Sequence, residues 1–156
     1  MTKTNAVRLI EQAGLPFRCT EYDYDERDLS GLHAAAAIGM PPEQVFKTLV
    51  ARGEKRGILV FCIPVCCALD LKKAAKAAGD KKIDMVPMKE LLPLTGYIRG
   101  GCSPIGMKKR YPTYIDETAV LYDEIAVSAG QRGQQILMLP DDLVRYAEMI
   151  LCDLTE

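Results

Sequence analysis

Four glycines, a proline and a basic triplet are concentrated in residues 95–110, TGYIRGGCSPIGMKKR. Glycine has no Cβ atom, so a ligand can approach its backbone closely, and Pro104 stiffens the same loop. Such a loop can present the amide N–H groups of Gly100, Gly101 and Cys102 to a carbonyl or phosphate oxygen. Alternatively, the glycines only form a tight turn, and the residue types alone leave these two interpretations even.

Lys47 is the single charged residue of an otherwise largely apolar stretch, VFKTLV at residues 45–50. If this stretch is a strand, Lys47 shares one face with Val45 and Leu49, because strand side chains alternate between faces. A lysine between two apolar neighbours lies either at an exposed edge or in a cavity. Spacing alone favours the exposed edge.

A cysteine nucleophile is a weaker hypothesis, with Cys102 as the thiolate and His33 as its base. Nothing in the sequence orients His33, which we expect on a helix surface. The six cysteines lie mostly in apolar runs, where we expect reduced, buried thiols. Cys62, Cys66 and Cys67 lack a second thiol pair or a histidine cluster, so we expect no metal site.

These residues must be positioned by a mixed set of short elements. A length of 156 residues with 49% apolar and 26% charged residues is typical of one globular domain, here residues 1–156. Periodicity and caps predict helices over 4–13, 30–38, 71–78, 87–92 and 140–152. Ser30 and Asp70 are the expected N-caps of the second and third helices, and Gly39 and Gly79 are expected to end them. Strands are expected over 17–24, 45–50, 57–63, 83–86, 113–116, 125–128 and 135–139. The pattern indicates an α+β (mixed α/β) fold with six or seven short strands.

Charge is segregated along the chain although the net charge is only −1. Residues 47–110 carry 14 Lys/Arg against 5 Asp/Glu, and the remaining residues carry 6 against 16. A local positive face is compatible with binding of an RNA end even when the whole chain is weakly acidic. We expect Lys108, Lys109 and Arg110, next to the glycine loop, to contact RNA.

No apolar run approaches the ~20 residues of a membrane helix, and the N-terminal residues lack the apolar core of a signal peptide. The expected location is cytoplasmic, without a membrane partner.

Three sequence blocks together resemble the YbaK/EbsC-type Cys-tRNA(Pro) deacylases, relatives of the editing domain of bacterial prolyl-tRNA synthetase. The blocks are VFKTLV (45–50), GYIRGGCSPIG (96–106) and VSAGQRG (127–133), in the family's order and at about its spacing. The resemblance covers essentially the whole chain. It implies a mixed sheet curled into a partial barrel, and an enzyme that acts on the 3′ end of an aminoacyl-tRNA without a cofactor.

The resemblance also implies roles for individual residues. Lys47 would be the essential residue of the pocket that receives the tRNA end, with Gly100 and Gly101 binding the ester carbonyl. Arg132 would serve the RNA or brace the loop. The residues that would bind the substrate are Tyr22, Thr48, Cys102, Ser103, Ser128, Gly130, Arg132 and Gln135.

Departures from the family pattern concern the amino-acid pocket. Gln135 stands where some members have an aspartate, Ala129 and Gln131 replace a glycine and a lysine, and no phenylalanine occurs near Leu29. The favoured substrate is Cys-tRNA(Pro), whose own thiol would attack the ester. Ala-tRNA(Pro) is the alternative, and a noncatalytic module that binds tRNA ends beside prolyl-tRNA synthetase is a rival of another class. The sequence leaves the oligomeric state open.

Overall fold

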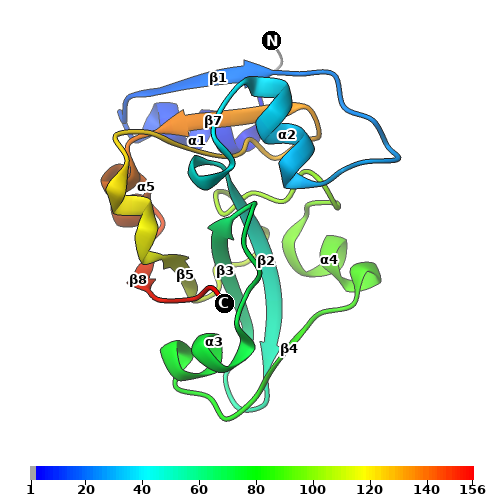
Figure 1. The fold of residues 1–156 in the computed structure, drawn as a ribbon, viewed down its shortest axis with the longest axis vertical. Coiled ribbons are helices and arrows are strands. Elements are labelled where there is room, and N and C mark those ends of the chain that lie inside the picture. Colours follow the sequence, from blue (N-terminus) through cyan, green and yellow to red (C-terminus); the bar gives the residue numbers. More distant parts are fainter. Residues whose placement is uncertain (1–2) are drawn as a thin grey trace.

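Eight strands build two sheets in residues 3–156, the part of the chain that this computed structural model describes (Figure 1). The smaller, antiparallel sheet has the order β1 (Phe17–Glu21), β7 (Gln134–Met138), β6 (Ile125–Ser128). The larger sheet has the order β4 (Ile83–Met85), β2 (Phe46–Gly53), β3 (Gly57–Pro64), β5 (Thr113–Asp116), β8 (Ile150–Cys152). In this sheet β2 is antiparallel to both of its neighbours, β4 and β3, whereas β3, β5 and β8 run parallel to one another. The predicted mixed α/β class is confirmed.

Five short helices pack around the sheets: α1 (Asn5–Gln12), α2 (Gly31–Ile38), α3 (Leu71–Ala78), α4 (Met88–Thr95) and α5 (Pro140–Tyr146). Single 3₁₀ turns occupy Pro42–Gln44 and Glu117–Leu121. Figure 1 shows α1 and α2 beside the smaller sheet, and α3 at the opposite end beside the β2–β3 hairpin. In residues 3–156, none of the helices is long and apolar enough to cross a membrane.

Helix boundaries follow the capping residues that the sequence suggests. The Ser30 side chain accepts a hydrogen bond from the amide of His33, and Asp70 caps α3 in the same way. Gly39 and Gly79 adopt the left-handed conformation that ends a helix. Both predicted helix starts and both predicted ends are therefore confirmed.

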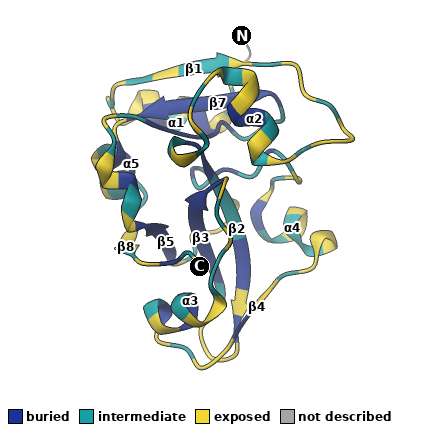
Figure 2. Cartoon of the chain, in the orientation of Figure 1, coloured by how far each residue is buried: buried dark blue, intermediate teal, exposed yellow. Residues whose placement is uncertain are grey.

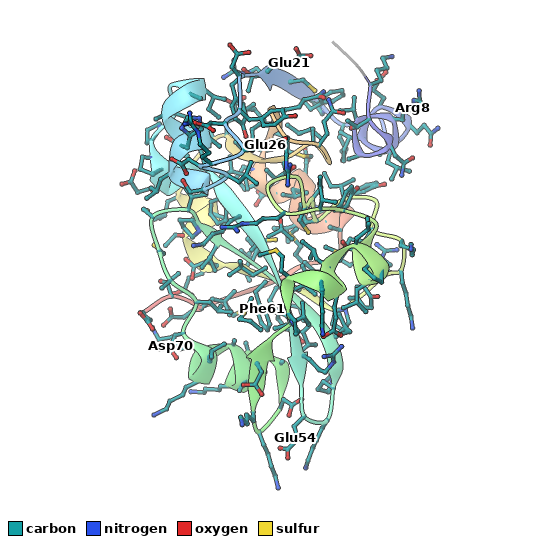
Figure 3. All side chains as sticks on the ribbon, turned by 90° about the vertical axis from the view of Figure 1, so that its right-hand side faces the viewer. Arg8, Glu21, Glu26, Glu54, Phe61 and Asp70 are labelled. Carbon is teal, nitrogen blue, oxygen red and sulfur yellow. The ribbon has the colours of Figure 1, made fainter. Side chains whose placement is uncertain are left out.

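The apolar core consists of separate clusters, and the first of them spans both sheets, because it also includes Phe46 and Ile115 of the larger sheet. One cluster packs α1 residue Ile10 against Ile125 and Ile136 of the smaller sheet. A second cluster lies in the larger sheet, where the Phe61 ring stacks on Tyr114 with centroids 5.2 Å apart. Figure 2 shows β3, β5 and β7 as mostly buried strands, and Figure 3 shows Phe61 inside the molecule. Each fully buried Ile, Leu or Phe side chain stabilises the fold by about 1.5–3 kcal/mol.

The strand β2 is paired differently along its length. It pairs with β3 throughout, but β4 covers its other edge only from Ala51 to Gly53. Before that point, a single isolated bridge joins Val45 to Ala126 at the start of β6. Among residues 3–156, no strand therefore pairs with the edge around Thr48, which lies between the two sheets.

Two expectations from the sequence need correction. The strands form two sheets linked by the bridge at Val45, instead of one sheet of six or seven strands curled into a partial barrel. The last helix ends at Tyr146 and does not continue to residue 152. Glu148 takes a left-handed backbone conformation (φ 52°), Met149 is buried, and the following residues form β8 beside β5. Strand pairing and burial of Met149 thus override the local helical pattern.

Candidate active site

A cavity of about 500 Å³ opens where β2 lacks a neighbouring strand. It is enclosed by β2, by the ends of β1, β6 and β7, by α2 with the loop before it, by the β4–α4 segment and by the glycine loop. The residues that line it are Tyr22, Leu29, Ser30, Gly31, Leu32, Ala34, Val45, Phe46, Lys47, Thr48, Leu49, Val50, Val65, Met85, Val86, Met88, Leu91, Arg99, Gly100, Cys102, Ser128 and Gln135. A volume of this size is ordinary for a small-ligand site.

We call the polar strand residues of the cavity, Lys47, Thr48, Ser128 and Gln135, the strand wall. Lys47 lies opposite Ile63 in the β2–β3 ladder and is partly buried. Within residues 3–156, it forms no ion pair with a carboxylate. The structure thus places Lys47 in a cavity wall, where the resemblance put it and where spacing alone did not. Its ammonium is available to an anionic or carbonyl group of a ligand.

The backbone of Thr48 also faces the cavity. Val50 turns its carbonyl away from β3, since that oxygen accepts a hydrogen bond from Val86 (3.2 Å). Backbone groups alternate between the two edges of a strand, so Thr48 presents its N–H and C=O to the same side. The Thr48 hydroxyl lies 3.7 Å from the sulfur of Cys62. Thr48 therefore offers the cavity a main-chain donor and acceptor.

Ser128 and Gln135 face each other across the β6–β7 ladder and both line the cavity. The Ser128 hydroxyl accepts a hydrogen bond from the amide of Gly130 (3.1 Å). Gln135 is 5% exposed, and its side-chain oxygen has no hydrogen-bond partner among the described residues. Leaving such a buried carbonyl unpaired costs about 1–3 kcal/mol, so this atom is an acceptor prepared for a ligand donor.

We call Arg99, Gly100 and Cys102 the loop wall. Gly100 adopts φ +84°, which favours glycine, and a Cβ there would lie 3.3 Å from Leu29. Gly101 is buried and outside the cavity, and its amide donates to the carbonyl of Ile98 (3.0 Å). The expected contact of the Gly101 amide with an ester carbonyl is therefore corrected: the turn already uses that donor. The amides of Gly100 and Cys102 remain the loop's candidates.

Gly101 instead lets the loop dock on a neighbouring turn. A Cβ on Gly101 would lie 3.1 Å from the Cα of Gln131 and 3.2 Å from the amide nitrogen of Arg132. The Arg132 guanidinium donates to the carbonyl of Arg99 (2.9 Å). The bracing role that was one expectation for Arg132 matches this geometry.

Two other predicted substrate contacts lie outside the cavity wall. Ser103 is fully buried, and its hydroxyl accepts a hydrogen bond from the amide of Ile105. Gly130 has φ +101°, and a Cβ there would lie 3.0 Å from the ring of Tyr97. Both residues shape the loop, whereas the predicted Tyr22 contact does line the cavity.

Among the described residues that line the cavity, no histidine accompanies Cys102. Burial raises the pKa of the Cys102 thiol to about 12, so the thiol stays protonated near neutral pH. His33 belongs to a separate small hollow, where its Nδ1 lies 3.8 Å from the carboxylate of Asp28. The His33 side chain is 34% exposed, as expected for a helix-surface residue. Among residues 3–156, no three His, Cys, Asp or Glu side chains form a cluster suited to a metal ion.

The basic triplet is exposed and lies outside the cavity wall. Arg110 donates to the carbonyl of Tyr146 and lies 3.7 Å from the carboxylate of Glu148, so it is partly engaged by the end of α5. Lys108 and Lys109 stay candidates for RNA contact at a distance from the cavity. The basic residue that lines the cavity besides Lys47 is Arg99, which the sequence reasoning did not select.

The apolar β4–α4 side of the cavity was also missed. Met85 and Met88 line the cavity and are 43% and 56% exposed, so they form an open apolar rim. Leu29, next to which the expected phenylalanine does not occur, also lies in the cavity wall. The exposed methionines beside a proline were the available signal, but that pattern is also typical of an ordinary short amphipathic helix.

Comparisons with known proteins agree with this geometry. A family model described as the aminoacyl-tRNA editing domain matches residues 31–146. A protein of Enterococcus faecalis, named as a candidate Cys-tRNA(Pro)/Cys-tRNA(Cys) deacylase EbsC, is 46% identical over 98% of this chain and 93% of its own length. A solved structure titled as a candidate trans-editing enzyme for prolyl-tRNA synthetase is 27% identical, with a TM-score of 0.84 over 99% of both chains. A structure titled only as a hypothetical protein shares the fold, with a TM-score of 0.86 over 96% of this chain and 97% of its own. The chain belongs to the aminoacyl-tRNA editing domain family.

Proposed function

We propose that this protein is a trans-editing deacylase that removes cysteine from mischarged Cys-tRNA(Pro). The observation that carries the proposal is Lys47, a lysine without a carboxylate partner in residues 3–156, in a cavity that also offers the unpaired oxygen of Gln135. The name of the 46% identical relative supports the same substrate. Cysteine and proline are similar in size, so the synthetase's own pocket can separate them by only about 1–3 kcal/mol, and a second site is needed.

The two ends of the cavity suit the two parts of an aminoacyl-tRNA terminus. The strand-wall end, with Ser128 and Gln135, would take the aminoacyl group, whose ammonium or thiol can donate to the Gln135 oxygen. The apolar end, with Met85 and Met88, would take the terminal nucleoside, because a base can pack its flat face on apolar side chains. Lys47 and Thr48 belong to β2, and this strand lines the cavity together with the residues of both ends.

The chemical step would then be carried by the substrate's own thiol. Its sulfur attacks the ester carbonyl carbon, a C–S bond forms, the C–O bond to the ribose breaks, and the thiol proton passes to the departing ribose oxygen. The products are free tRNA and a cyclic thiolactone, which water later opens. The amides of Gly100 and Cys102 would stabilise the oxyanion, and the Lys47 ammonium would stabilise the negative charge of the leaving oxygen or a nearby phosphate.

Preformed Cys-tRNA(Pro), Ala-tRNA(Pro) and Pro-tRNA(Pro) test this proposal when each is incubated with the purified protein and with a Lys47→Ala variant as control. We expect rapid loss of the cysteinyl ester, survival of the prolyl ester, and loss of the cysteinyl ester slowed by about 10²–10³ with the variant. Faster loss of the alanyl ester than of the cysteinyl ester would identify alanine, in place of cysteine, as the amino acid that the protein removes.

If all three esters survive, prolyl-tRNA synthetase is added to the same reactions. Hydrolysis that appears only then would make the synthetase an obligatory partner. Survival of all esters in its presence would overturn the deacylase in favour of a noncatalytic module that binds tRNA ends.

A further inference from the structure

Two adjacent cysteines, which the proposed chemistry does not use, lie in the turn that follows β3. Cys66 is exposed and Cys67 is partly buried, with their sulfur atoms 3.9 Å apart. The amide of Cys67 donates to the carbonyl of Pro64 (3.0 Å), which closes the turn. The two thiols are therefore in contact, and Cys66 is open to a reagent in solution.

This turn adjoins the wall of the cavity. Its first residue, Val65, lines the cavity and donates its amide to the carbonyl of Val45 (2.8 Å). Val65 packs so closely on α2 that a Cβ at Gly31 would lie 2.2 Å from its side chain. A change in the shape of the turn would therefore move a residue of the cavity wall and press on α2.

The charge of Lys47 also reaches this turn. Burial, Cys66 and Asp116 raise the pKa of the Cys67 thiol, while Lys47 acts in the opposite direction and lowers it. An interaction of this kind places Cys67 within electrostatic range of the residue to which we assign the central role in deacylation.

We propose that Cys66 and Cys67 form a vicinal dithiol site that reacts with small-molecule disulfides and slows the enzyme reversibly. The Cys66 thiolate attacks one sulfur of a disulfide RSSR, forming a mixed disulfide and releasing RS⁻. The Cys67 thiolate then attacks the sulfur of Cys66 and expels the second RS⁻. Two protein thiols are oxidised, and one RSSR is reduced to two RSH after the released thiolates take up the two protons.

The geometry favours a reversible bond at this site. Adjacent Cα atoms are about 3.8 Å apart, below the ~4.4–6.8 Å of ordinary disulfides, so the bond would be strained and easily reduced. Cys62 and Cys102 also interact with each other, but burial raises the pKa of each to about 12. Their thiols stay protonated near neutral pH, whereas Cys66 is exposed, so a reagent in solution meets the surface pair first.

Intact-mass analysis after incubation with oxidised glutathione tests the covalent step without reference to activity. We expect the wild-type protein to lose the mass of two hydrogens without a retained adduct. Fragmentation of the peptide that contains both residues should place the new disulfide between Cys66 and Cys67. A Cys67→Ser variant should keep a glutathione adduct on Cys66, a Cys66→Ser variant should stay largely unmodified, and Cys152→Ser should behave as wild type. A persistent adduct on the wild-type protein, or a cross-link elsewhere, would overturn the proposal.

The effect on the enzyme rests on the proposed function and has its own readout. We expect oxidised wild-type protein to deacylate about tenfold more slowly, since misplacement by ~1 Å beside the chemistry can cost up to about 100-fold. Dithiothreitol should restore the rate, and Cys66→Ser should be insensitive to the oxidant. An oxidised protein with the Cys66–Cys67 disulfide and an unchanged deacylation rate would overturn the regulatory role alone. A reduced protein that is inactive on every ester would count against the proposed deacylase function and leave the covalent step standing.

Discussion

The strand wall and the loop wall of the cavity are built by different physical means. Lys47 and Gln135 are positioned by backbone ladders, each with a fixed partner on a neighbouring strand. Gly100 is positioned by close packing of a backbone without Cβ atoms, and by the Arg132 hydrogen bond to Arg99 that fastens the loop. Ladder hydrogen bonds fix the direction of each side chain, whereas the loop depends on the absence of atoms at a few positions.

From this difference we expect the strand wall to carry the groups that act on the substrate and the loop wall to set the shape of the cavity. The strand wall holds a cation and a buried acceptor that no described residue pairs with, so substitutions there should remove activity and leave folding intact. The glycine loop that carries the loop wall should respond in the opposite way, since small additions of volume at Gly100 or Gly101 disturb packing first. Deacylation activity and the free energy of unfolding, measured together on each variant, therefore distinguish the two walls.

Replacement of Lys47 by alanine should have the largest effect on turnover. Removing a group that stabilises transition-state charge costs about 10²–10³ in kcat, and we expect a loss of that size. The free energy of unfolding should change little, because Lys47 has no ion-pair partner in residues 3–156 to lose. Single-turnover deacylation and urea unfolding measure the two quantities, and a variant of near wild-type rate would remove Lys47 from the chemistry. Lys47→Arg should recover only part of the rate, since its larger fork does not fit where a compact ammonium does.

Gly101→Ala should come next and should act through the loop. The added Cβ would meet backbone atoms 3.1–3.2 Å away, which cannot move as a flexible side chain can. We expect about 1–3 kcal/mol of lost stability from overpacking, with a fall of about tenfold in kcat/KM as the loop shifts.

Gly57→Ala is the matched control for the loop substitution. It is the first residue of β3, directly after the hairpin turn, and adopts φ +74°. None of the described residues has an atom within 4 Å of a Cβ added there. It should lose about 1–2 kcal/mol from backbone strain and keep full activity. Equal activities of the two variants would show that the loop wall does not shape the site.

Gln135→Leu should have a smaller effect on catalysis and an opposite effect on stability. Loss of one hydrogen bond to the substrate should raise KM by about 3- to 10-fold, corresponding to about 0.5–1.5 kcal/mol. Removing a buried acceptor that no described residue satisfies should leave the free energy of unfolding unchanged or increase it. An unchanged KM would mean that the Gln135 oxygen does not face the substrate.

Cys102→Ala should have the smallest effect, with a rate within about threefold of wild type, since substrate and loop amides supply the chemistry. The pKa of the Cys102 thiol is raised from its ordinary value of 9.0 to about 12 in the folded protein. Above pH ~9 the unfolded chain therefore binds fewer protons than the folded chain, and stability falls as pH rises through about 12. Urea midpoints at about pH 8 and pH 10 should differ less in Cys102→Ala than in wild type. A rate profile that loses an inflection in this variant would instead support a cysteine nucleophile.

Much of the strand wall could be predicted from sequence, because short-range patterns determine it. The β-branched and apolar residues of VFKTLV mark β2, and Asp70 and Ser30 mark helix starts that the structure reproduces. The direction of Lys47 could not be derived in this way. Alternation states which residues share a face, but the missing neighbour strand that opens the cavity depends on pairings between distant segments. Only the family resemblance supplied that information.

The loop wall and the chain's end were harder to predict for the same reason. The docking of Gly101 on the turn at Gln131 joins residues that nothing local relates. The local pattern after Pro140 continues a helix, yet pairing with β5 makes the last residues a strand. Arg99 belongs to the block GYIRGGCSPIG, but its place in the cavity depends on the hydrogen bond from Arg132.

The central claim is that the cavity acts on an ester whose own thiol is the nucleophile. Single-turnover deacylation of Cys-tRNA(Pro) against S-methylcysteinyl-tRNA(Pro) tests it most directly, with competition between the two esters as the control for binding. The account predicts that the methylated ester competes for the site and survives at the spontaneous rate while the cysteinyl ester is consumed. Cleavage of both esters at the same rate would contradict the account and require water or a protein group as the nucleophile.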